Sequence, residues 1–89
     1  MVIVYVLRSR KDKRFYVGCT NDLRTRFELH NKGRIASTKL RKPFDLVYYE
    51  ACRSRDDALH REKYLKTTYG KRYIHNRIKH YLRDPAVPD

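Results

Sequence analysis

The chain has 89 residues, which is enough for one small domain, and it carries 22 lysine and arginine residues against 10 aspartate and glutamate residues, a formal net charge of +12. A domain of this size buries only about 60–65% of the surface that its unfolded chain exposes, so its core is thin and an active site would be an open cleft. Such a charge excess destabilises a compact fold unless a polyanion relieves it, and nucleic acid is the commonest such partner.

Two further features narrow the class of protein. Cys19 and Cys52 belong to no C-x-x-C unit, so reduced thiols are expected in place of a disulfide framework or a zinc site. The apolar run Met1–Leu7 is too short to span a membrane and lacks the charged region of a signal peptide. The sequence also has no Lys-rich helix with a broad apolar face. We therefore expect a cytoplasmic protein that does not act at a membrane.

The N-terminal part of the chain predicts a β-hairpin. Val2–Leu7 (VIVYVL) is rich in β-branched and aromatic residues, as strands are. Ser9–Lys13 is a polar, charged turn, and Arg14–Gly18 (RFYVG) is a second strand that ends at a glycine. Because the connection is short, the two strands should pair antiparallel.

A helix and a third strand should follow. The helix runs from about Asp22 to Asn31, with Asn21 as its N-cap and Gly33 as its stop. Residues 34–43 are basic and irregular, and Phe44–Cys52 (FDLVYYEAC) reads as the third strand.

Two more helices complete the expected fold. Ser54 caps a helix that runs to about Tyr69, where Gly70 breaks it, and a last helix covers roughly Lys71 to Arg83. The order β-β-α-β-α-α predicts an α+β fold, a three-stranded antiparallel sheet flanked by three helices. Residues 1–83 should form a single domain, and residues 84–89, with two prolines, a frayed tail.

An acid interrupts the apolar face of the helix that follows Ser54. Ala58, Glu62 and Leu65 share one face of that helix, which should pack against the sheet. A half-buried carboxylate must be paired, protonated or bound to a metal. Periodicity leaves open whether Glu62 forms a salt bridge to an arginine or binds a metal.

Other polar side chains gather on the preceding elements. Arg26 and His30 are one turn apart on the helix at 22–31; the first can present two donors to a phosphate, and the second can move a proton near neutral pH. A solvated basic face is the alternative. Tyr5 and Tyr16 lie in the two arms of the hairpin, where both could reach one face of the sheet, although strand tyrosines are more often core residues.

This combination resembles the GIY-YIG nuclease family. The matching elements are, in order, Ile3-Val4-Tyr5, Tyr16-Val17-Gly18, Arg26 with His30, Arg61-Glu62 and Asn76. The resemblance extends from Met1 to about Leu82. Within the family, the chain is similar to the nuclease domain of the excision-repair endonuclease. Ile3 replaces the first glycine of the family pattern and Val17 replaces an isoleucine, both at strand positions that should not touch substrate. The chain looks like the stand-alone, single-domain bacterial type, for which no appended DNA-targeting domain is expected.

The resemblance implies a divalent-metal-dependent endonuclease that hydrolyses phosphodiester bonds, in DNA more than in RNA, directed by structure more than by base sequence. Glu62 would hold one Mg²⁺ or Mn²⁺, and Arg26 would neutralise charge on the phosphate. Tyr5 is the favoured general base, with Tyr16 and His30 orienting water and phosphate. An ordinary phenol is a poor base near pH 7, so the surrounding cations would have to favour its phenolate. Asn76 should hydrogen-bond toward the site.

Nucleic acid is the expected partner, and no small-molecule organic cofactor is expected. The candidate nucleic-acid-binding residues are Lys39, Arg41, Lys42, Lys63 and Lys66. The rival interpretation is a non-catalytic basic nucleic-acid-binding module, which leaves Glu62 unexplained because an anion on a phosphate-binding face weakens binding. The oligomeric state is open, and so is the pathway among repair, recombination and element mobility.

The nuclease interpretation carries a geometric expectation. The functional groups of Tyr5, Tyr16, Arg26, His30 and Glu62 should line one open concavity, within roughly 10 Å of one another. Glu62 should be partly exposed there and without a close Arg or Lys partner.

Overall fold

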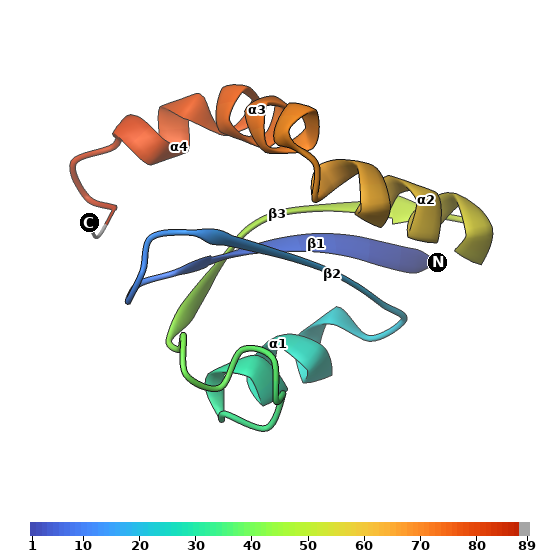
Figure 1. Cartoon of the computed structure of the whole chain (residues 1–89), viewed down its shortest axis with the longest axis horizontal. Coiled ribbons are helices and arrows are strands. Elements are labelled where there is room, and N and C mark those ends of the chain that lie inside the picture. The colour runs from blue at the N-terminus through green and yellow to red at the C-terminus, as the bar shows by residue number, and fades with distance from the viewer. Residues whose placement is uncertain (88–89) are drawn as a thin grey trace.

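The computed structural model describes residues 1–87 and contains one antiparallel three-stranded sheet. The central strand β1 (Val2–Ser9) pairs with β2 (Phe15–Thr20) on one side and with β3 (Phe44–Cys52) on the other. Helix α1 lies against one face of the sheet, and α2, α3 and α4 lie across the other (Figure 1). The predicted α+β class is confirmed, with one more helix than expected, because the last predicted helix is broken in two.

Strand alternation divides the side chains of β1 between the two faces. The valines at positions 2, 4 and 6 pack in one apolar cluster with Ala58, Leu65, Ile74 and Ile78 from α2, α3 and the residue after α3. Tyr5 and Leu7 pack in a second cluster on the α1 side, together with Phe44 and the half-buried Tyr16. The two hairpin phenols therefore share the α1 face, as the sequence predicted.

Helix α1 (Leu23–Asn31) begins one residue later than predicted. Its N-cap is Asp22, not Asn21, because the Asp22 carboxylate accepts hydrogen bonds from the Thr25 backbone N–H at 3.2 Å and from the Thr25 hydroxyl at 2.8 Å. The predicted stop at Gly33 is confirmed. Gly33 has a φ of +73° and donates to the His30 carbonyl, an ending that favours glycine and turns residues 34–43 back beside α1 (Figure 1).

Helix α2 (Arg55–Leu65) begins after Ser54 as predicted but ends four residues before Tyr69. The hydroxyl of Thr67 accepts from the Gly70 N–H and caps a new helix, α3 (Thr68–Arg77). Gly70 therefore lies inside α3 and does not break a helix. A Cβ at this position would collide with the Tyr64 carbonyl, so the glycine permits the close approach of α3 to the end of α2.

The C-terminal segment contains a short last helix, α4 (Lys79–Arg83), separated from α3 by Ile78. The predicted frayed tail begins with a turn, in which the Val87 N–H donates to the Asp84 carbonyl, and its last two positions, 88 and 89, lie outside the described residues. Cys19 and Cys52 are free thiols. Among residues 1–87, no helix is long and apolar enough to cross a membrane.

Candidate active site

The centre of the candidate site is a buried hydrogen bond between β1 and α1. Tyr5 is 1% exposed, and its hydroxyl lies 2.9 Å from Nε2 of His30. Gly18 of β2 is the partner of Tyr5 in the sheet, and a Cβ on Gly18 would collide with the Tyr5 hydroxyl and ring. Glycine at this position therefore leaves the space that the Tyr5 side chain occupies, which gives the second sequence motif a steric reason.

His30 is fully buried, and both of its ring nitrogens have partners. Nε2 faces Tyr5, and Nδ1 lies 2.7 Å from the hydroxyl of Thr38. Burial, and then the charge of Arg26, lower the pKa of His30 to about 4, so the imidazole is neutral near pH 7. The prediction that His30 helps to orient water and phosphate stays a prediction; because the ring is buried and both nitrogens are occupied, any such effect would pass through Tyr5.

Tyr16 and Arg26 complete the polar group on this face. The Tyr16 ring centroid is 5.0 Å from that of His30 and 6.4 Å from that of Tyr5. Arg26 is exposed on α1, one turn before His30, and it lies close enough to Tyr5 to act on the pKa of that phenol. Four of the five predicted groups therefore meet on one side of the sheet.

The fifth group, Glu62, approaches from α2. Its side chain is 20% exposed, and its charge acts on the pKa of Tyr5 as well as on that of Cys19, which burial raises first. The expectation that Glu62 lacks a close cationic partner is wrong, since Lys66 Nζ lies 3.3 Å from its Oε2. Lys66 is 56% exposed and one helical turn away, and such a pair contributes only about 0.3–0.5 kcal/mol. The ion pair with Lys66 therefore restrains the Glu62 carboxylate only weakly.

The environment of Tyr5 favours the neutral phenol. Burial and then the neighbouring Tyr16 phenol raise the pKa of Tyr5 to about 12, with a smaller contribution from Glu62, while Arg26 acts in the opposite direction. The expectation that surrounding cations favour a Tyr5 phenolate is therefore wrong for the free protein. Tyr5 can accept a proton at its oxygen only while it passes its own proton to another group, and His30 Nε2 is the group in place.

The other predicted site residues lie apart from this cluster. Asn76 is exposed on α3, and within residues 1–87 no hydrogen bond or ion pair connects it to the site. Lys39, Lys42 and Lys63 are exposed, as a phosphate-binding role requires. Lys66 is exposed too, although it pairs with Glu62.

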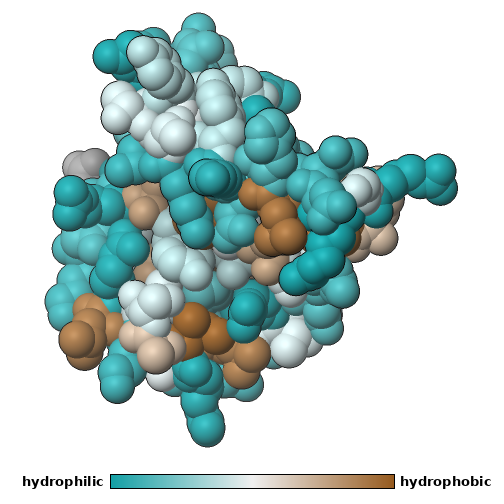
Figure 2. Space-filling view, turned by 45° about the vertical axis from the view of Figure 1, so that its right-hand side comes forward, coloured by the Kyte–Doolittle hydropathy of each residue, from teal (hydrophilic) through white to brown (hydrophobic). Residues whose placement is uncertain are grey.

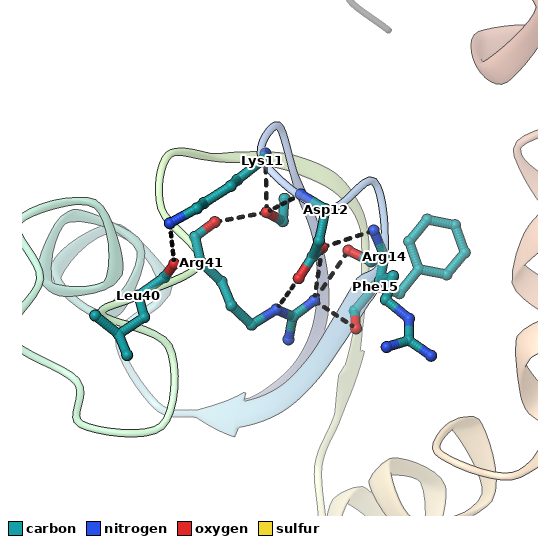
Figure 3. Close-up of polar contacts among 7 residues, drawn as sticks. Lys11, Asp12, Arg14, Phe15, Leu40 and Arg41 are labelled. Atoms are coloured by element: carbon teal, nitrogen blue, oxygen red, sulfur yellow. Dashed lines mark hydrogen bonds and ion pairs between the residues drawn. The ribbon is translucent and has the colours of Figure 1, made fainter.

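Arg41 is used inside the protein, contrary to its predicted role as a phosphate ligand. Its guanidinium binds the Asp12 carboxylate, with Nε 2.6 Å from Oδ2, and donates to the carbonyls of Arg14 and Phe15 (Figure 3). The hydrogen bond from Arg41 holds the pKa of Asp12 at about 2. Arg41 therefore ties the segment 34–43 to the turn of the hairpin, and its charge is already compensated.

Two features of the structure were missed in the sequence. Thr38, the partner of His30, lies in a basic segment where no pattern marks it. Arg61, part of the matched Arg-Glu pair, forms an ion pair with Glu50 of β3, with Nε 2.5 Å from Oε1. Only the position of Glu50 in a strand that faces α2 could have indicated this pair.

A hollow of about 570 Å³ lies between the hairpin turn, Arg41 and α3. It is lined by Asp12, Lys13, Arg14, Phe15, Arg41, Lys71 and His75. None of the predicted catalytic residues borders it. It adds a basic surface at the end of the sheet but is separate from the Tyr5 cluster.

The fold and the cluster together define a small, basic α+β domain with an arginine, two phenols and a neutral imidazole on one face of its sheet, and a carboxylate on α2 within electrostatic range of one of the phenols. A family model described as the GIY-YIG catalytic domain matches residues 1–81. The chain belongs to the GIY-YIG family, and membership in this family implies nuclease activity.

Two relatives illustrate the match. The chain is similar to the UPF0213 protein YazA of Bacillus subtilis (strain 168), 38% identical over 69 residues that cover 76% of this chain and 69% of the relative. It is also similar to a UPF0213 protein of Staphylococcus aureus (strain Mu3), 40% identical over 65 residues that cover 72% of this chain and 78% of the relative. No solved structure matches the chain.

Proposed function

We propose that this chain is a divalent-metal-dependent endonuclease that hydrolyses phosphodiester bonds in nucleic acid, DNA before RNA, and selects its substrate by structure more than by base sequence. The observation that carries the proposal is the meeting of Tyr5, Tyr16, Arg26 and His30 on one face, within electrostatic range of Glu62. Separate structural roles would scatter these groups, whereas phosphodiester hydrolysis needs them around one phosphate and its attacking water.

Substrate binding rests on charge. Arg26 is exposed and can present two donors to the non-bridging oxygens of the scissile phosphate. The excess of 22 basic over 10 acidic residues then attracts the flanking phosphates. Lys39, Lys42 and Lys63 are exposed for this role. On the face seen in Figure 2, hydrophilic residues cover most of the surface and apolar residues form only separate patches.

Glu62 is the residue proposed to hold the metal. Residues 1–87 contain no group of three or more His, Cys, Asp or Glu side chains suited to an ion, so one carboxylate would be completed by waters and phosphate oxygens. Such a shell is normal for Mg²⁺ and acceptable for Mn²⁺. When bound, the cation supplies a Lewis acid that polarises the phosphate and stabilises the leaving oxygen. The weak, exposed contact with Lys66 leaves the carboxylate available.

The proton of the attacking water is proposed to leave through Tyr5. As the water O–H bond breaks, the proton adds to the Tyr5 oxygen, and the Tyr5 proton moves along the 2.9 Å hydrogen bond to Nε2 of His30. The water becomes the hydroxide that attacks phosphorus, and His30 becomes a short-lived cation, which its pKa of about 4 drives to return the proton. Tyr5 never becomes a free phenolate, which its pKa of about 12 disfavours. Tyr16 is proposed to orient the water, and the 6.4 Å between its ring and that of Tyr5 supports this role.

We also propose a cytoplasmic location, because a reducing environment suits the free thiols of Cys19 and Cys52. The proposed reaction requires no organic cofactor.

The proposal is tested by incubating the protein with single-stranded, duplex, flapped and branched DNA and RNA, each with Mg²⁺, Mn²⁺ or a chelator. Cleavage with either metal, abolished by the chelator and by Glu62→Gln, is the expected result. Binding without cleavage of any substrate would overturn the proposal in favour of a non-catalytic binding module. Cleavage that survives both the chelator and Glu62→Gln would overturn the role of the metal.

A further inference from the structure

The partner of His30 on the side away from Tyr5 is a buried hydroxyl. Thr38 is fully buried, and its Oγ1 lies 2.7 Å from Nδ1 of His30 and 3.5 Å from the Ile35 carbonyl, to which it donates. A polar side chain with no exposed surface, in a segment otherwise rich in exposed lysine and arginine, needs a reason. The reason lies in its two hydrogen-bond partners, His30 and the Ile35 carbonyl. Together with Thr38 they fix the donor and the acceptor of each hydrogen bond in the series that ends at Tyr5.

The directions follow from what each group can donate. Thr38 has one hydroxyl hydrogen, which it donates to the Ile35 carbonyl, so its oxygen accepts from Nδ1 of His30. A neutral imidazole has a single N–H, which therefore lies on Nδ1. Nε2 is then unprotonated, and it accepts from the Tyr5 hydroxyl, which lies 2.9 Å away. Each donor in this series has an acceptor.

We propose that Thr38 is a positioning residue that holds His30 in the tautomer with its proton on Nδ1, so that Nε2 stays free to accept the Tyr5 proton. This proposal rests on the proposed function, in which Tyr5 loses that proton during hydrolysis. Without the Thr38 hydroxyl, a buried Nδ1–H would have no acceptor, and the other tautomer would be favoured. Its Nε2–H would donate to the Tyr5 oxygen and block the transfer.

The segment that carries Thr38 is itself held in place. The Lys39 N–H donates to the Ile35 carbonyl at 3.0 Å and the Arg41 N–H to the Thr38 carbonyl at 2.9 Å, which forms a tight turn around Thr38. The Arg41 side chain then binds Asp12 of the hairpin turn, and the hydroxyl of Ser9 donates to the Arg41 carbonyl at 2.5 Å (Figure 3). The internal use of Arg41 thus fixes the Thr38 hydroxyl relative to the hairpin that supplies Tyr5.

The tautomer can be measured directly, with ¹⁵N-labelled protein and long-range ¹H–¹⁵N spectra of the His30 ring near pH 7. The wild-type protein should show the proton on Nδ1. Thr38→Val keeps the shape of the side chain but removes the hydroxyl, and it should move the population toward Nε2–H. Thr38→Ser keeps the hydroxyl and should retain the wild-type spectrum. Thr68→Val is the matched control, because Thr68 is an exposed threonine on α3 with no side-chain bond among the described residues.

Cleavage assays with Mg²⁺ and the preferred substrate complete the test. Thr38→Val should lower kcat about 10- to 100-fold, by analogy with the loss of a partner that orients a metal-bound histidine, and leave KM unchanged. Thr38→Ser should recover most of the rate, and Thr68→Val should match the wild type. A proton on Nε2 in the wild type, or a folded Thr38→Val with unchanged tautomer and kcat, would overturn the proposal. Because the wild-type spectrum needs neither a variant nor cleavage, a proton on Nε2 there would overturn the proposal even if Thr38→Val does not fold or the chain cuts no substrate.

Discussion

Two sets of a tyrosine, an arginine and a glutamate lie around the same sheet: Tyr48, Arg61 and Glu50, and Tyr5, Arg26 and Glu62. We call the first set closed, because its charged groups bind partners within the protein. Glu50 accepts from Arg61 at 2.5 Å and from the Tyr48 hydroxyl at 2.8 Å, and the Arg61 guanidinium lies 4.7 Å from the centre of the Tyr73 ring. Its carboxylate and guanidinium are occupied by partners from β3, α2 and α3.

The second set is open. Arg26 is exposed, and within residues 1–87 Glu62 has an exposed lysine as its only ion-pair partner and the Tyr5 hydroxyl is hydrogen-bonded to His30 and not to a carboxylate. Arg61 and Glu62 are adjacent in sequence, yet they belong to different sets because successive residues of a helix point in different directions. The same residue types therefore stabilise the fold where their bonds are satisfied internally, and remain available to a ligand where they are not.

The two glutamates should differ most, because Glu62→Gln should affect the cleavage rate and Glu50→Gln the free energy of unfolding. Glu62→Gln removes the proposed metal ligand, so the cleavage rate should fall about 100- to 1000-fold while the free energy of unfolding changes little. Glu50→Gln leaves Arg61 without its carboxylate, so the free energy of unfolding should fall by about 1–3 kcal/mol while the folded protein still cuts. Cleavage assays and urea denaturation of both variants measure the contrast. The opposite pattern, with Glu62→Gln mainly unstable and Glu50→Gln inactive, would reverse the assignment.

The two tyrosines provide the next comparison. Tyr5→Phe removes the proposed proton carrier and should lower kcat about 100-fold, at the lower end of the range for general acid–base catalysis. Tyr48→Phe removes one hydrogen bond to Glu50 and should cost about 1 kcal/mol of stability with little change in kcat. Equal loss of activity in both variants would show that the rate follows stability and not the Tyr5 hydroxyl.

His30, the hydrogen-bond partner of Tyr5, should make the free energy of unfolding depend on pH. Because His30 has a pKa of about 4 in the folded protein and an ordinary value near 6.5 when unfolded, only the unfolded chain gains its proton between these values. The free energy of unfolding should therefore fall as the pH drops from about 6.5 to about 4, by roughly 3 kcal/mol from this residue. Urea denaturation across that range measures the fall. His30→Gln should lose the pH dependence; if it keeps the full slope, another group is responsible.

The sequence predicted the strands well, and the reason is their pattern. Val2–Leu7 alternates between two buried faces, and Phe44–Cys52 has an apolar and aromatic centre, Leu46–Tyr49, so the first strand was found except for its last two residues and the third strand in full. The end of α2 was wrong because Gly70 has two uses in proteins, as a helix stop and as a point of close packing. Only the position of the Tyr64 carbonyl decides between them.

The candidate site was predicted in its membership more than in its chemistry. Sequence order and resemblance brought Tyr5, Arg26 and Glu62 together, but the protonation of Tyr5 and His30 depends on burial that no local pattern reveals. His30 is covered by Thr38, whose place is set by the fold of residues 34–43. Such long-range contacts cannot be deduced from a segment without periodicity.

The smallest expected change in the free energy of unfolding is that of Lys66→Gln. It tests whether the Glu62 carboxylate is available to a ligand. The sequence left open whether Glu62 serves a salt bridge or a metal, and the structure does place Lys66 within 3.3 Å of it. If the set is open, Lys66→Gln should change the free energy of unfolding by no more than about 0.5 kcal/mol, the usual contribution of an exposed pair one helical turn apart. Arg61→Gln, in the closed set, should cost about 1–3 kcal/mol in the same denaturation experiment, because it leaves the half-buried Glu50 carboxylate without its cation. A loss for Lys66→Gln as large as that for Arg61→Gln would mean that Glu62 is held in a structural ion pair, and the carboxylate would then be no better placed to bind a metal than Glu50 is.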